Sequence, residues 1–146
     1  MREILFRGQT RKFGEKVNMN GDKLPGKWVY GGIFPQKKGG AYSIIYTYDP
    51  IDKYPVYAET VGQYTGLVDK NGAKIFEGDV IQDIKTNELF TICWHGSFAQ
   101  FVASELRKPN KATRNYHDLF LKDRGSIVIG NIFDNPELLS KAERRT

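Results

Sequence analysis

The chain has 146 residues, 40% of them hydrophobic and 27% charged, which is the balance of a globular domain rather than a disordered chain. Its one cysteine, Cys93, excludes an internal disulfide and favours a reducing, cytoplasmic location. No run of about 18 apolar residues is present, so we expect no membrane-spanning helix. Residues 1–7 are too short and too charged for a signal peptide.

The net charge of +5 is concentrated in one segment. Residues 107–114 hold four basic residues and no acidic residue, which leaves an excess of only +1 elsewhere. We therefore expect a nearly neutral protein with one basic loop. The four residues are Arg107, Lys108, Lys111 and Arg114.

The first part of the chain predicts extended segments separated by polar turns. Alternating apolar residues predict a strand over residues 2–7 and a clear strand over residues 42–48. Residues 27–34 predict another extended region, interrupted at Gly31-Gly32 by a bulge. Pro55 is expected to break the segment that follows residue 48.

The middle of the chain predicts a hairpin. Asp69-Lys-Asn-Gly72 is a turn sequence, because Asn and Gly tolerate positive φ. It is expected to join Leu67-Val68 to residues 74–76, and Glu77-Gly78 is expected to form a second turn.

Further strands are expected near residues 79–84, 88–94, 98–102, 116–121 and 126–133. Asn135-Pro136-Glu137 predicts the start of a short C-terminal helix, with Leu138 and Leu139 packed on the sheet. The predicted fold is mainly β: a small antiparallel, SH3-like barrel over residues 61–140, an N-terminal β extension over residues 1–60, and a tail at 141–146.

Three stretches resemble the YopX family of phage and prophage proteins: Arg2–Arg7, Gln63–Val80 and Ile129–Leu139. Their order and spacing cover nearly the whole chain. The resemblance implies a β-rich fold, a phage or prophage gene and a cytoplasmic protein, and it supplies no catalytic residues. The chain departs from the family's usual Arg-Ala-Trp at Gly8 and Gln9. The glycine pattern of the middle stretch also resembles SH3-like barrels at the level of the fold.

Few residues could form a catalytic or metal site. Cys93 and His95 share one face of a strand, and His117 could approach from a neighbouring strand, which would allow a Cys–His nucleophile. Cys93 stands among Phe90, Ile92 and Trp94, however, and free cysteines are usually buried. The chain lacks the usual paired metal-ligand motifs, so we expect no metal and no cofactor.

The acidic residues of the middle stretch have two interpretations. Asp69, Glu77 and Asp79 could act as paired carboxylates, but we favour structural roles, in which Asp69 stabilises its turn and Asp79 caps the next one. The glycines at 62, 66, 72 and 78 fit neither a Walker loop nor a dinucleotide fingerprint, because no helix follows them.

Two non-catalytic functions remain. The basic loop could bind nucleic acid, with Tyr116 or the row of Tyr42, Tyr46 and Tyr48 stacking on bases. Alternatively, the aromatic residues could form a protein interface, because Tyr, Phe and Trp are enriched in interface cores. We expect a non-catalytic binding or assembly module, a homo-oligomer rather than an enzyme, and we retain nucleic-acid binding as the alternative.

Overall fold

The computed structural model describes residues 3–10, 27–34, 39–48, 51–106 and 125–139, and only the backbone of residues 116–118. The chain divides into two compact units, Met1–Gln63 and Tyr64–Thr146, which are described separately. The basic loop containing Arg107, Lys108, Lys111 and Arg114 lies outside the described residues. Among the described residues, no helix is both long and apolar enough to cross a bilayer.

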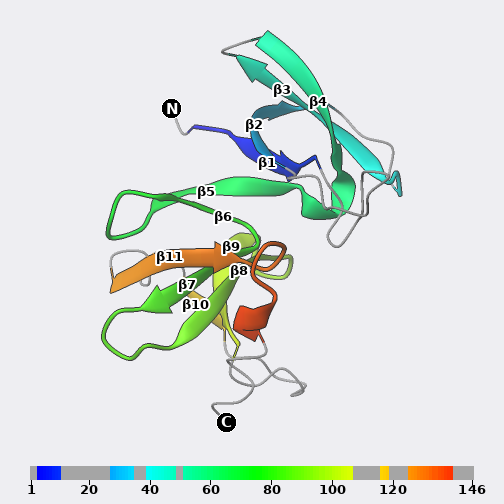
Figure 1. Ribbon diagram of the computed structural model, residues 1–146. Helices are drawn as coiled ribbons and strands as arrows, with labels where there is room; N and C mark the ends of the chain where they lie inside the picture. Colours follow the sequence, from blue (N-terminus) through cyan, green and yellow to red (C-terminus); the bar gives the residue numbers. More distant parts are fainter. Residues whose placement is uncertain are drawn as a thin grey trace. The chain divides into compact units, whose positions relative to one another are not determined.

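The N-terminal unit is built from antiparallel strands in the order β4-β3-β2-β1, with β5 next to β1 (Figure 1). A short 3-10 helix, η1, precedes β5, and the Thr60 hydroxyl in η1 accepts a bond from the backbone N–H of Gln9 (2.9 Å). The elements are β1 (Phe6–Gln9), β2 (Trp28–Ile33), β3 (Tyr42–Tyr48), β4 (Ile51–Tyr57), η1 (Ala58–Thr60) and β5 (Gly62–Val68).

The core of this unit lies on one face of its strands. Val29, Ile45 and Val56 are buried together, and half-buried apolar side chains, including Phe6 and Tyr54, pack against them. Successive side chains of a strand point to opposite faces. Because Ile45 is fully buried, the tyrosines of β3 point away from this core.

The structure differs from the sequence predictions at three places in this unit. β1 begins at Phe6, later than predicted. The predicted interruption at Gly31-Gly32 is wrong, because β2 runs through both glycines. A Cβ at Gly31 would lie 1.8 Å from the Tyr46 carbonyl oxygen, so a close approach of two backbones requires glycine there.

Pro55 does not break the chain as predicted, since it lies inside β4. Among the described strands, β4 lies at the edge of its sheet. The Ala58 N–H donates to the Ala41 carbonyl (3.0 Å), so these two residues form a hydrogen-bonded pair. Hydrogen-bonded and non-hydrogen-bonded pairs alternate along an antiparallel ladder, so the pair three residues further on is a non-hydrogen-bonded one. The register pairs Ile44 with Pro55, so the nitrogen of Pro55, which carries no hydrogen, faces the open edge.

In the C-terminal unit, the last part of β5 pairs with β6, and a second antiparallel sheet has the order β10-β9-β8-β7-β11 (Figure 1). The predicted hairpin around Asp69-Lys-Asn-Gly72 is confirmed, with Val68 opposite Lys74 and Gly72 at φ +82°. The further strands are β6 (Lys74–Phe76), β7 (Asp79–Asp83), β8 (Leu89–His95), β9 (Gln100–Glu105), β10 (Tyr116–Asp118) and β11 (Ser126–Asn131).

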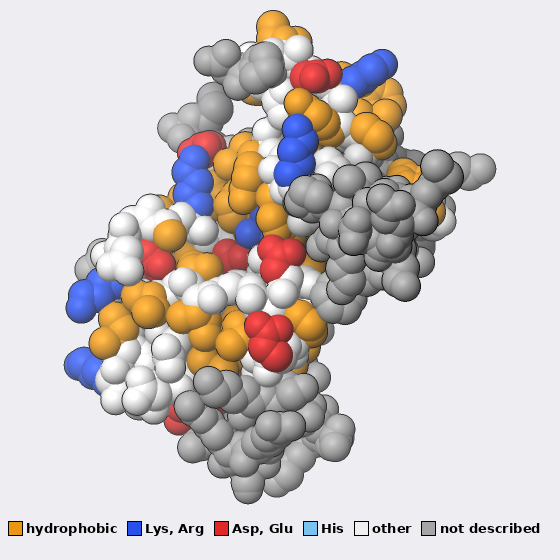
Figure 2. Space-filling model, viewed as in Figure 1, with side chains coloured by type: hydrophobic (Ala, Val, Ile, Leu, Met, Phe, Trp, Pro, Cys, Tyr) orange, Lys and Arg blue, Asp and Glu red, His pale blue; other side chains and the backbone are white. Residues whose placement is uncertain are grey.

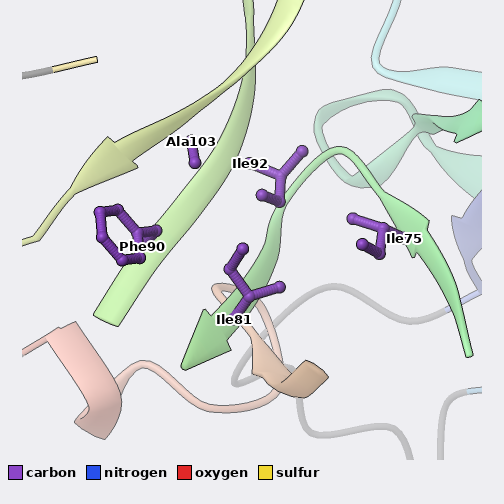
Figure 3. Close-up of a cluster of buried hydrophobic side chains, with 5 residues drawn as sticks. All are labelled: Ile75, Ile81, Phe90, Ile92 and Ala103. Atoms are coloured by element: carbon purple, nitrogen blue, oxygen red, sulfur yellow. The ribbon is translucent and has the colours of Figure 1, made fainter. Parts of the chain in front are cut away.

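Both faces of the second sheet are apolar. Four buried residues of one face, Ile81, Phe90, Ile92 and Ala103, pack with Ile75 of β6 in the cluster drawn in Figure 3. On the other, Val80, Leu89 and Leu106 pack with the C-terminal segment. As predicted, Leu138 and Leu139 of a helical turn at residues 137–139 pack against this second cluster.

The mainly β, antiparallel fold is therefore confirmed, but the closed barrel is not. The pairings of the described strands give two open sheets, with β10 and β11 at the edges of the second. A barrel needs hydrogen bonds between its first and last strands, and the described backbone makes no such pairing. The SH3-like character of residues 61–140 stays a prediction.

Candidate functional site

Asp69 organises the turn at residues 69–72. Its side chain is buried and accepts three backbone N–H bonds, from Asn71 (2.8 Å), Ala73 (2.9 Å) and Val128 (2.9 Å). The first two close the turn, and the third ties it to β11. A carboxylate held by three backbone donors is a structural element, which confirms the structural interpretation of Asp69.

Asp79 has the same kind of role at the next turn. It is 2% exposed, and its Oδ2 accepts the Phe76 N–H at 2.8 Å. This bond closes the Glu77-Gly78 turn, so the capping role predicted for Asp79 is also confirmed. Asp69 and Asp79 therefore stabilise two successive turns of the second unit.

Cys93 and His95 lie on β8. Cys93 is not in a disulfide and is half-buried rather than buried as expected. The His95 Nδ1 accepts the Phe98 N–H (3.3 Å), and its ring stacks on the Phe98 ring with the centroids 4.2 Å apart. The backbone of His117 in β10 pairs with Ala103 of β9. Among the described residues, no group of three or more Cys, His, Asp or Glu side chains is placed to hold a metal ion.

The tyrosine row of β3 lies on the surface. The register places residues of β2 and β4 beside it: Gly32 pairs with Tyr46, and Tyr48 pairs with Ile51. We name this surface the aromatic face. Its six large side chains, each between 40% and 87% exposed, are Tyr30, Phe34, Tyr42, Tyr46, Tyr48 and Ile51.

Ring contacts hold parts of the aromatic face in place. Phe34 lies 6.1 Å from Tyr46, and Tyr42 lies 4.9 Å from Tyr57 on the neighbouring strand, measured between ring centroids. Such tilted pairs restrict the rings before any partner arrives. Figure 2 shows apolar side chains reaching the surface of the N-terminal strands.

The aromatic face is large for an uncovered surface. With about 200 Å² for each large side chain, the exposed fractions of its six residues correspond to roughly 700 Å². The largest apolar patch of a typical monomer is about 300–600 Å², and a standard interface buries about 800 Å² on each partner. The aromatic face therefore has the size of a binding surface.

A groove adjoins the aromatic face within the same unit. It has a volume of about 560 Å³. The residues that line it include Trp28, Tyr30, Tyr48 and Tyr54, together with the Gly31-Gly32 pair. Lys27 also lines it, with its Nζ 4.1 Å from the centroid of the Tyr54 ring. We name this feature the aromatic groove.

Sequence reasoning identified the tyrosine row but not the groove. Its lining comes from residues 3–5, from β2, and from the β3–β4 hairpin, so no local motif marks it. The available signal was the density of aromatic residues around the glycine pair in Trp-Val-Tyr-Gly-Gly. The predicted basic site, formed by Arg107, Lys108, Lys111 and Arg114, lies outside the described residues.

Comparisons with known proteins found a family match and a similar crystal structure. A crystal structure of protein EF1440 from Enterococcus faecalis is similar, with 25% sequence identity over 67% of this chain and 74% of that chain, and a TM-score of 0.40. No curated protein matches the chain. The sequence model described as YopX protein matches residues 22–140. Because that match covers most of the sequence, the chain belongs to the YopX family.

Proposed function

We propose that this protein is a non-catalytic assembly module that binds a second copy of itself through the aromatic face. The observation that supports this most is the orientation of β3, whose tyrosines point outward while Ile45 fills the core. Exposing aromatic rings costs free energy in an isolated molecule. A partner that covers them recovers that free energy.

The charge of the face favours a second copy as the partner. Of the described residues in β2, β3 and β4, the register places one charged residue on this face: Lys53, which pairs with Tyr46. A nearly uncharged apolar surface fits another surface of the same kind. In a twofold dimer the same surface of each copy meets that of the other. Lys53 lies on the edge strand, where its ammonium can stay in water when the two faces meet.

The edge of β4 is a poorer docking site than the face. Pro55 presents no N–H to an added strand, and Lys53 also lies on this strand. Proline and lysine on an edge strand oppose edge-to-edge pairing. We therefore infer that copies associate face to face rather than by extending the sheet.

Light scattering across a range of concentrations tests the proposal. We expect the mass of the native protein to rise from 16.7 kDa towards twice that value. The double variant Tyr46→Ser/Ile51→Ser should raise the dimer dissociation constant at least tenfold, because buried aromatic and apolar anchors dominate interfaces. Far-ultraviolet circular dichroism should confirm that this variant is folded.

The matched control is Trp94→Ser/Phe98→Ser, which removes two exposed apolar side chains from the other unit. We expect it to associate like the native protein. A native protein that stays at 16.7 kDa at every concentration, or a control variant that dissociates equally, would contradict the proposal.

The phage or prophage origin and the cytoplasmic location are part of the same proposal. The family resemblance supports the first, and the single cysteine supports the second.

The alternative function is nucleic-acid binding through Arg107, Lys108, Lys111 and Arg114. Its support is the acid-free run of four basic residues in the sequence. If these residues contact phosphates, changing all four to Gln should flatten the slope of log affinity against log salt by about 3 for a single strand. The matched control changes the exposed lysines Lys70, Lys74 and Lys85. Undetectable binding at low salt would exclude this function.

A further inference from the structure

The turn between β8 and β9 carries exposed aromatic rings that do not belong to the aromatic face. Trp94 is 52% exposed and Phe98 is 60% exposed, and residues 96–100 are all exposed. With about 200 Å² for each large side chain, these two residues present roughly 220 Å² to solvent. We name residues 94–101 the β8–β9 tip. Turns usually consist of small polar residues, so two exposed rings at this tip indicate a binding surface.

The β8–β9 tip extends beyond the neighbouring strands of its sheet. On one side, the Gly78 N–H at the start of β7 donates to the Ile92 carbonyl (2.9 Å). On the other side, Asp118 at the end of β10 pairs with Val102, which pairs with Cys93. At about 3.4 Å for each residue, the hairpin continues roughly 10 Å past this level before it turns.

The rings of the tip are held in place on both sides of the hairpin. Trp94 pairs with Phe101 across the strands, with the ring centroids 5.1 Å apart and the planes at 73°. The ring of His95 stacks on that of Phe98, at 4.2 Å. Because Trp94 and His95 are consecutive, they point to opposite faces of the hairpin. A one-sided groove on a protein partner would cover only one of these aromatic pairs, whereas a fluid medium would cover both.

The hairpin is free of charged residues over a long stretch. Residues 89–104 include no Asp, Glu, Lys or Arg. Apolar side chains of peripheral proteins enter a bilayer to a depth of about 5–10 Å, which is close to the length by which the tip extends. The lack of charge therefore matches the boundary between lipid headgroups and acyl chains, where an ionised side chain would be costly.

The backbone of the turn also suits an environment poor in water. The Ala99 N–H donates to the Gly96 carbonyl (3.3 Å), and the Phe98 N–H donates to the His95 Nδ1 (3.3 Å). Backbone groups without a partner are costly in lipid, and these two donors already have one. Ala99 has a φ of +49°, a conformation in which Asn is enriched. Alanine there supplies a methyl group in place of a polar amide.

We propose that the β8–β9 tip binds the surface of a lipid bilayer by inserting Trp94 and Phe98 at the boundary between headgroups and acyl chains. The indole suits this depth, because its body is apolar and its N–H can donate to a headgroup. Binding through one small apolar anchor is weak and reversible. This surface is separate from the aromatic face, so the inference does not depend on self-association.

Vesicles of phosphatidylcholine, which carry no net charge, are the probe. The chain has two tryptophans, so Trp28→Phe leaves Trp94 as the only tryptophan reporter. The titration is done at about pH 8, where an ordinary imidazole is neutral, and at a concentration where light scattering gives the monomer mass. We expect a saturable blue shift of Trp94 emission, quenching by lipids brominated on the acyl chains, and little change with salt.

The variant Trp94→Ser/Phe98→Ser tests which residues enter the lipid. Its partition coefficient, measured by sedimentation with vesicles, should fall at least tenfold because the exposed apolar area of the tip is removed. Val68→Ser/Ile84→Ser is the matched control, since these side chains of the same unit are 43% and 40% exposed. It should bind like the native protein. Circular dichroism should confirm that both variants are folded.

Tyr46→Ser/Ile51→Ser separates this inference from the assembly proposal. That variant should lose self-association and still bind vesicles like the native protein. If it loses vesicle binding, the lipid contact lies on the aromatic face and the inference is wrong.

Three further results would overturn the inference: no shift of Trp94 emission with phosphatidylcholine, equal sedimentation of the Trp94→Ser/Phe98→Ser variant, or binding only to vesicles that contain phosphatidylserine. The last result would assign membrane binding to basic residues rather than to the tip.

Discussion

Asp69 illustrates how much one side chain contributes to this fold. Two of its hydrogen bonds close a local turn, to Asn71 and Ala73, and one reaches Val128, 59 residues away in the sequence. The turn could be predicted, because Asp and Gly at these spacings favour it. The bond to Val128 could not, since it depends on how β11 is placed.

Replacing Asp69 tests this role. Asp69→Ala leaves three backbone donors without their acceptor, and we expect a loss of about 3 kcal/mol in the free energy of unfolding. Urea unfolding followed by circular dichroism measures it. Asp52→Ala is the control, because Asp52 is exposed and, among the described residues, accepts the N–H of its neighbour Lys53. A change below about 0.5 kcal/mol for Asp69→Ala would show that the turn does not depend on the carboxylate.

At the scale of the element, β3 is the strand whose orientation matters most. Alternation predicted the strand correctly, with Tyr42, Tyr46 and Tyr48 on one face. It could not predict which face is buried, because both faces carry apolar residues. The structure buries Ser43 and Ile45 and exposes the tyrosines. Neighbouring strands decide this, since Val29 and Val56 pack on Ile45.

Substitutions on opposite faces of β3 should therefore differ in cost. Ile45→Ala removes a fully buried side chain and should destabilise the protein by about 2–5 kcal/mol. Tyr48→Ser changes a residue that is 87% exposed and should change the free energy of unfolding by no more than about 0.5 kcal/mol. Urea unfolding below the dimerisation concentration compares them. A larger cost for Tyr48→Ser would mean that the assigned faces are reversed.

Gly31 and Pro55 mark where local sequence reasoning fails in these elements. Both residues suggest breaks, because glycine and proline weaken isolated strands. In the structure, Gly31 permits contact with the Tyr46 backbone and Pro55 faces an open edge. The place of each residue in the sheet explains why it is tolerated there, and the neighbouring residues in the sequence do not determine that place.

At the scale of the whole molecule, the sequence was sufficient for the family and the β class but not for the sheet order. The pairing of β1 with both β2 and β5 joins residues that are far apart in the chain. Local patterns predict strands, whereas closure into a barrel depends on pairings between distant strands. For the same reason, the aromatic face could be predicted only as a row on one strand, and the groove not at all.

The central claim is that the aromatic face is the surface where two copies meet. Hydroxyl-radical footprinting tests it most directly, comparing concentrations at which light scattering gives 16.7 kDa and twice that mass. We predict that Tyr42, Tyr46 and Tyr48 are oxidised less in the assembled protein, while Trp94 and Phe98 are oxidised equally in both. Equal oxidation of the tyrosines, or protection confined to Trp94 and Phe98, would contradict the claim.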